Sequence, residues 1–173
     1  MSLAAKMTDL PTFLAYSMVM EDEAADRHDE LADVMDVHNN PDVAATFRKL
    51  AHYSRLHAQE IRDQAGDSKI PKIAPWDFEW EGGEPPENAD SDEVHYLMNR
   101  AQALKLAMEN EKRAHDFYSD IAANAPDEGV RELAAEFAAE EQEHLDLLIA
   151  WREKIPESEE ETAYDPDPPH MPE

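Results

Sequence analysis

The chain has 173 residues, which is enough for one domain with a packed core and too few for two comfortable domains. Its 41 acidic and 15 basic residues give a formal net charge of −26, which disfavours nucleic acid and anionic membrane surfaces as partners and favours cations. It contains no cysteine, which excludes thiolate metal sites, iron–sulfur clusters and disulfides formed by these residues.

No apolar run is long enough to cross a membrane, and the N-terminal residues lack the basic and apolar regions of a secretion signal. We therefore expect a cytoplasmic protein without a membrane partner. Glycine is rare, and the alternation of apolar and polar residues that marks strands is absent. The sequence therefore predicts an all-α fold.

Four segments carry apolar residues at alternating steps of three and four, the period of an amphipathic helix. The predicted helices cover about residues 10–37, 41–65, 92–124 and 127–153. Thr8 or Asp9 can cap the first helix. Asn40 can cap the second, and residues 90–92 can cap the third.

Residues 66–92 form a long connection without a helical period, interrupted by several prolines. A helix of about 25 residues is ~37 Å long, so an extended connection of this length can cross it. The second and third helices would then be parallel, which predicts a four-helix bundle with a long crossover. We expect Trp76, Phe78 and Trp80 to pack on the side of this bundle.

The chain is thus predicted to divide into a helical bundle over residues 1–153 and a tail over residues 154–173. The tail is acidic and rich in proline, so it cannot continue a helix. Disorder is the expected state of the tail, and a docking segment is the alternative.

Each predicted apolar stripe is interrupted by ionisable side chains near its middle. Glu21 lies on the first stripe, His57 on the second and Glu111 on the third. Glu141 and His144 interrupt the fourth, one turn apart. Such groups are costly to bury unless something pairs with them, and carboxylate oxygen with imidazole nitrogen suits iron, manganese or zinc. Glu-x-x-His alone is a weak motif, and solvated side chains are the alternative interpretation.

The two predicted helical hairpins are similar in sequence. Corresponding positions are Glu21 with Glu111, His28 with Tyr118, Ser54 with Glu141, and His57 with His144. Two similar hairpins that pack about a pseudo-twofold axis bring these side chains to one level of the core.

These residues resemble the ferritin-like di-iron carboxylate proteins, most closely the rubrerythrin-type branch. That family takes one Glu from each of two helices and a Glu-x-x-His from each of the other two. The resemblance implies a ferritin-like bundle with a metal site made of Glu21, His57, Glu111, Glu141 and His144. It also implies that Glu141 bridges two iron ions, with manganese or zinc as alternatives.

Ser54 departs from the family pattern, because this position holds a second bridging glutamate in the family. Three carboxylates then face two divalent ions, so we expect the second ion to bind more weakly or a single ion to be held. Water, an exogenous anion or Glu60 can take the place of the lost ligand. By the same resemblance, His28 and Tyr118 are expected to orient the ligands.

The resemblance implies an oxidoreductase in which an iron pair reacts with peroxide or dioxygen and a separate protein donates electrons. A protein that binds or sequesters iron, or another divalent metal, without turnover is the alternative. A purely structural bundle is disfavoured, because unpaired buried acids would destabilise it. The sequence does not determine the oligomeric state, and a homodimer is compatible with it.

Overall fold

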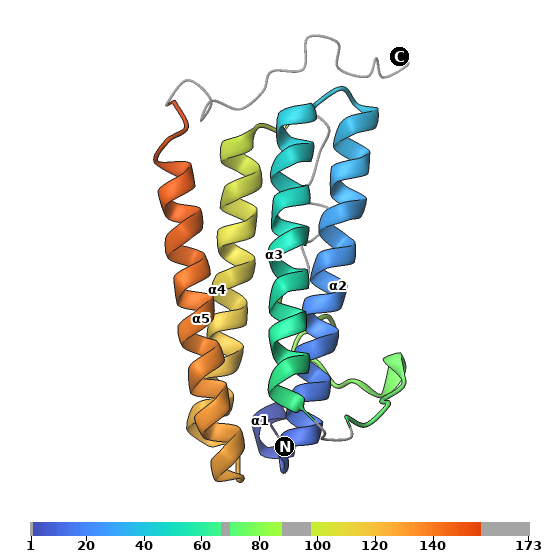
Figure 1. Cartoon of the computed structure of the whole chain (residues 1–173), viewed down its shortest axis with the longest axis vertical. Helices are drawn as coiled ribbons and strands as arrows, with labels where there is room; N and C mark the ends of the chain where they lie inside the picture. Colours follow the sequence, from blue (N-terminus) through green and yellow to red (C-terminus); the bar gives the residue numbers. More distant parts are fainter. Residues whose placement is uncertain (1, 67–69, 88–97, 157–173) are drawn as a thin grey trace, which may run out of the picture.

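The structure is a computed structural model that describes residues 2–66, 70–87 and 98–156 (Figure 1). Its helical elements are α1 (Leu3–Lys6), α2 (Leu10–Val37), α3 (Pro41–Ala65), the 3-10 turn η1 (Pro75–Asp77), α4 (Arg100–Asn124) and α5 (Glu128–Arg152). The described residues contain no strand, so the predicted all-α fold is confirmed. None of the helices among them is long and apolar enough to cross a membrane.

The four long helices pair as two antiparallel hairpins. α2 packs against α3, and α4 packs against α5. α3 and α4 lie side by side and run in the same direction (Figure 1). This is the predicted four-helix bundle, in which the chain crosses the length of the bundle between its second and third long helices.

Aspartate side chains cap the starts of α2 and α5, and the cap at Asp9 was predicted. Asp9 Oδ1 accepts a hydrogen bond from Thr12 N at 2.8 Å, and Asp127 Oδ1 accepts one from Val130 N at 2.9 Å. These side chains satisfy backbone N–H groups that have no partner inside the first turn of a helix. The limits of α2 and α3 coincide with those predicted.

The start of α4 differs from the prediction. The helix begins at Arg100, and Asn99 caps it through a reciprocal pair of 2.9 Å hydrogen bonds with Gln102. Asn99 followed by Gln102 three residues later is a capping box, which the sequence analysis did not use. The cap predicted within residues 90–92 lies outside the described residues, as does the predicted tail from residue 157 onward.

Asn40 does not cap α3 with its side chain as expected. Its Nδ2 instead donates a hydrogen bond to the carbonyl oxygen of Met98 at 2.5 Å, where the chain enters α4. The turn between α2 and α3 is thereby tied to the start of the other hairpin, a long-range contact that a local capping rule cannot detect.

Two apolar clusters fill the bundle, and a polar layer separates them. The first cluster includes Phe13, Tyr118 and Phe137, and the second includes Leu31 and Phe47. Between these clusters every long helix carries polar side chains, with buried alanines among them on α2 and α3. The polar side chains are Glu21 and His28 on α2, Ser54 and His57 on α3, Asn110 and Glu111 on α4, and Glu141 and His144 on α5.

The crossover packs on the bundle through two of its three predicted aromatic residues. The ring centroids of Phe78 and Trp80 lie 4.8 Å and 5.0 Å from that of Tyr16, and Trp80 also contacts Phe117. Trp76 is 84% exposed, so the prediction that it packs on the bundle is wrong. It lies in η1, a single turn that buries none of its residues.

The short helix α1 was not predicted, because four residues cannot show a helical period. It buries Leu3 and Ala4 in the first apolar cluster. Leu3 N donates a hydrogen bond to Glu81 Oε1 at 3.1 Å, so α1 also contacts the crossover. The first residues of the chain therefore help to fix the crossover on the bundle.

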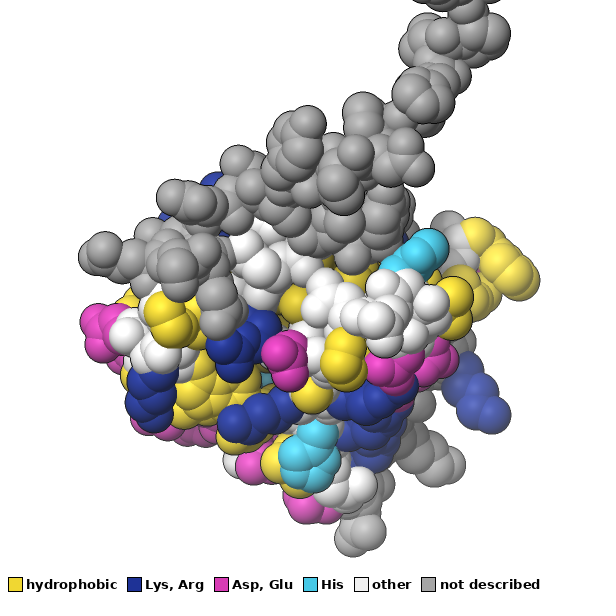
Figure 2. Space-filling model, turned by 90° about the horizontal axis from the view of Figure 1, so that it is seen from above, with side chains coloured by type: hydrophobic (Ala, Val, Ile, Leu, Met, Phe, Trp, Pro, Cys, Tyr) yellow, Lys and Arg dark blue, Asp and Glu magenta, His cyan; other side chains and the backbone are white. Residues whose placement is uncertain are grey.

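Figure 2 looks onto the end of the bundle that carries the turn between α2 and α3. Basic side chains lie among hydrophobic ones on this face. A groove there is lined by Lys49, Arg100, Trp151 and Lys154, and Lys49 Nζ lies 3.6 Å from the centre of the Trp151 ring. This groove lies at the end of the helices, whereas the polar layer lies near their middle.

The packing of the crossover leads to a prediction about stability. Trp80→Ala removes contacts with the core, so we expect a loss of about 2 kcal/mol in the free energy of unfolding, below the ~3–5 kcal/mol of a fully buried aromatic residue. Trp76→Ala is the matched control and should change it by less than about 0.5 kcal/mol. Urea denaturation followed by circular dichroism measures both. Equal losses in the two variants would contradict this packing.

Candidate metal centre

Glu21 and His57 form the half of the polar layer that belongs to the first hairpin. Both side chains are about 2% exposed. His57 Nδ1 and Glu21 Oε1 lie 2.6 Å apart, a short distance for a hydrogen bond that a charge assists. The sequence placed these two residues on facing stripes of α2 and α3, and the structure brings them into contact.

Glu111 and His144 form the equivalent pair in the second hairpin. His144 Nδ1 lies 3.6 Å from Glu111 Oε2, with side-chain exposures of 30% and 16%. This pair is looser and more accessible than the first, although it occupies the corresponding positions in the repeat. The two histidine rings meet edge to face with centroids 4.8 Å apart, so the two halves meet at the centre of the layer.

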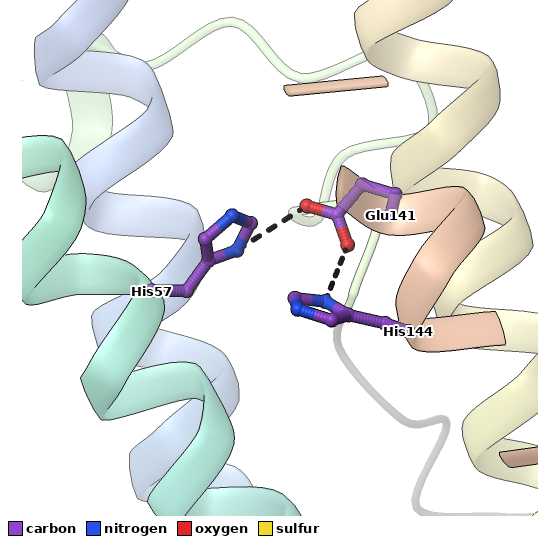
Figure 3. Close-up of side chains that lie close together, drawn as sticks. All are labelled: His57, Glu141 and His144. Carbon is purple, nitrogen blue, oxygen red and sulfur yellow. Dashed lines mark hydrogen bonds and ion pairs between the residues drawn. The ribbon is translucent and has the colours of Figure 1, made fainter. Parts of the chain in front are cut away.

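Glu141 lies between the two histidines and is fully buried (Figure 3). Its Oε1 is 3.4 Å from His57 Nδ1, and its Oε2 is 3.3 Å from His144 Nδ1. Because His57 Nδ1 is already paired with Glu21, Glu141 Oε1 has no hydrogen-bond partner among the described residues. A buried carboxylate oxygen without a donor is costly, and a cation would stabilise it.

Glu87 is a fourth acid in the layer, and the sequence analysis missed it. It lies in the crossover, directly after Pro85 and Pro86, and is 4% exposed. One carboxylate oxygen from each of Glu21, Glu87 and Glu141 lies within 4.8 Å of the other two. Helical periodicity cannot detect a residue outside a helix, and the only signal in the sequence was an acid following two prolines in an unusually long loop.

The other ring nitrogen of His57, Nε2, also contacts a carboxylate. His57 Nε2 lies 2.9 Å from Glu140 Oε2, whose side chain is 42% exposed. Glu60 lies near the same two residues and is exposed. Glu140 was not among the residues singled out in the sequence, but here its contact with Nε2 fixes the orientation of the His57 ring.

Burial and mutual repulsion raise the pKa of the central acids. Burial is the largest cause for Glu21, Glu87 and Glu141 alike, and the neighbouring carboxylates add to it. Burial also opposes the charge of Glu111, but His144 outweighs this effect and the pKa of Glu111 is lowered. Without a metal ion, the layer therefore has to retain protons in order to remain buried.

His57 is the main positive charge in the metal-free layer. Burial alone would lower its pKa, but Glu21, Glu140 and Glu141 outweigh burial and raise the pKa to about 12. The imidazole therefore carries a proton on each nitrogen at neutral pH. A metal ion bound at Nδ1 would have to replace the proton there, while Nε2 could keep its hydrogen bond to Glu140.

His28 and Tyr118 flank the layer at corresponding positions of the two hairpins. Burial lowers the pKa of His28 to about 4, so its ring is neutral at pH 7. Burial and the charges of Glu21 and Glu141 raise the pKa of Tyr118 well above its usual value, so the phenol keeps its proton. Both side chains are buried, and neither His28 Nδ1 nor Tyr118 Oη has a hydrogen-bond partner among the described residues, so their role in orienting the ligands stays a prediction.

The side chains of the layer fit a divalent metal centre. They supply several carboxylates and two imidazoles, and Glu141 Oε1 has no hydrogen-bond partner among the described residues. Carboxylate with imidazole is the ligand chemistry of iron, manganese and zinc in proteins. Each histidine pairs with a glutamate of its own hairpin, and Glu141 lies between the two pairs.

A four-helix bundle with a crossover and a central Glu and His layer defines the ferritin-like di-iron class of protein. A model of the rubrerythrin family matches residues 12–151, so the chain belongs to that family. The chain is 43% identical to an uncharacterised conserved protein from Magnetospirillum magnetotacticum, whose crystal structure superposes with a TM-score of 0.63. That match covers 86% of this chain and 96% of the other. Comparison with curated proteins gives no match.

The charges of the layer predict how the stability of the metal-free protein depends on pH. His57 in the folded state keeps a proton that the unfolded chain loses above pH 6.5, so folding is favoured at low pH and less so as the pH rises. We expect the free energy of unfolding to fall by about 1.4 kcal/mol per pH unit for this proton between pH 6.5 and 9. The lowered pKa of His28 adds no slope there, because its effect is complete above pH 6.5.

Urea denaturation of chelator-treated protein at several pH values measures this slope. His57→Gln should reduce the slope by the contribution of one proton, about 1.4 kcal/mol per pH unit, whatever it does to the stability itself. His52→Gln, which changes an exposed histidine on the same helix, should leave the slope as in the parent. A parent protein whose stability is flat or rises over this range would contradict the protonated state of His57.

Proposed function

We propose that this protein is a di-iron oxidoreductase that acts on peroxide or dioxygen and receives its electrons from a separate donor protein. The observation that carries the proposal is the fully buried Glu141 between two histidines, with one oxygen that has no hydrogen-bond partner among the described residues. Membership of the rubrerythrin family supports iron as the metal.

The proposed ligands divide between the two hairpins. Glu21 and His57 would hold one ion, Glu111 and His144 would hold the other, and Glu141 lies where it could bind either ion. Bound iron would supply the one-electron chemistry that carboxylate and imidazole side chains lack. The second pair is the more exposed one, so small molecules would approach the site from its side.

The residues around the site control protons and water. Tyr118 holds a proton at Oη, where burial and the nearby acids prevent its loss. Neutral His28 lies near Glu111 and can share a hydrogen bond with it without adding charge. Phe137 stacks on Phe13 with centroids 5.6 Å apart, and this aromatic cluster excludes bulk water from one side of the layer.

A turnover experiment separates this function from its alternative, metal sequestration. Protein loaded anaerobically with ferrous iron is given peroxide and an excess of a chemical reductant. We expect peroxide consumption far beyond the amount of bound iron, and we expect Glu141→Gln to lose most of it. Glu143→Gln, an exposed residue on the same helix, should match the parent. Consumption that stops once the bound iron is oxidised would identify a sequestering protein.

The contact between Glu140 and His57 predicts a separate effect on affinity. Glu140→Ala removes the carboxylate that orients the ring, so iron should bind about 10–100-fold more weakly with the same number of ions per chain. Anaerobic competition with a coloured chelator measures this change, and Glu143→Ala is the control. An affinity equal to that of the parent would show that Glu140 does not support the ligand.

A further inference from the structure

The repeat of the two hairpins contains one ligand position that has no charged side chain in the first hairpin. Glu21 corresponds to Glu111 and His57 corresponds to His144, but the position equivalent to Glu141 is Ser54. Ser54 is buried, with 8% exposure. The four long helices therefore supply three central carboxylates, and two divalent ions would retain a net positive charge in a buried site.

Glu87 enters the same layer from outside the helices. It approaches Glu21 and Glu141 within 4.8 Å, oxygen to oxygen, and its charge also acts on Tyr118. Burial is the largest cause that raises the pKa of Glu87, the charges of Glu21, Glu141 and Glu111 add to it, and His57 opposes them. An acid placed among other acids in a core is destabilising unless a cation joins them.

The crossover holds Glu87 in this position through contacts on both sides of the turn that contains Gly82 and Gly83. Before the turn, Glu79 N donates a hydrogen bond to the Tyr16 hydroxyl at 3.2 Å. After the turn, Arg113 Nε donates to the carbonyl oxygen of Pro86 at 2.9 Å, directly before Glu87. Arg113 also donates to the side chain of Asn110, next to Glu111, so it connects the crossover to the second hairpin.

We propose that Glu87 is a metal ligand, and that the crossover supplies with it the carboxylate that α3 lacks at Ser54. This inference rests on the proposed di-iron function. Glu21, Glu87, Glu111 and Glu141 then balance the charge of two divalent ions, and the unpartnered oxygen of Glu141 points to a cation in the same place. Glu60, the alternative from the sequence, is exposed and groups with the outer face of His57 instead.

Anaerobic titration with ferrous iron, followed by metal analysis of the isolated protein, tests this inference. The parent should bind two ions per chain. Glu87→Gln should keep one ion and bind the second at least about tenfold more weakly, since a carboxylate ligand is removed. Glu84→Gln, an exposed acid in the same loop, should match the parent, and so should Glu60→Gln.

A melting experiment without metal shows whether the variant is folded. Glu87→Gln replaces a buried acid by an amide of the same shape, so the chelator-treated variant should melt at or above the temperature of the parent. Glu87→Asp keeps the charge but shortens the side chain by one methylene group. It should also weaken the binding of the second ion. The double variant Ser54→Glu with Glu87→Gln should regain the second ion.

The outcomes separate this inference from the proposed function. A parent protein that binds no iron would overturn both. If the parent binds two ions and Glu87→Gln binds both equally well, the role of Glu87 alone is overturned. The same holds if Glu60→Gln loses the second ion and Glu87→Gln keeps it. A double variant that fails to regain the second ion would show that Glu87 does not replace a carboxylate at Ser54.

Discussion

The buried carboxylate of Glu141 is the group on which the rest of the structure depends. It lies between two histidines from different hairpins, and one of its oxygens has no hydrogen bond to any residue that the structure describes. The two apolar clusters end where this layer begins, so the bundle has to pack around charged groups in its middle. In the metal-free protein, retained protons and the imidazolium of His57 compensate for this charge. A divalent metal would compensate for it more directly.

The two hairpins are related in sequence but are unequal in structure. The Glu21 and His57 pair is closed and in tight contact, whereas the Glu111 and His144 pair is looser and more accessible. The crossover adds to this asymmetry, because it packs against α2 and α4 and brings an acid into the layer. A connection that first appears to serve only the topology of the bundle therefore contributes to its chemistry.

Most of the fold could be predicted from the sequence, because amphipathic periods and caps are local signals. The limits of α2 and α3 and the five central Glu and His residues followed from period and repeat alone. Glu87, Glu140 and the exposed Trp76 could not be predicted in the same way. Glu87 and Trp76 lie in a loop without periodicity, and the role of Glu140 depends on which nitrogen of His57 faces the core.

The central claim is that the polar layer holds two metal ions on either side of Glu141. Crystals grown after anaerobic loading with ferrous iron, measured at the iron absorption edge, would test it most directly. The account predicts two anomalous peaks inside the bundle, one nearer His57 and one nearer His144, with the Glu141 carboxylate between them. Iron found only at the exposed acids Glu60 and Glu140, with no peak in the buried layer, would contradict it.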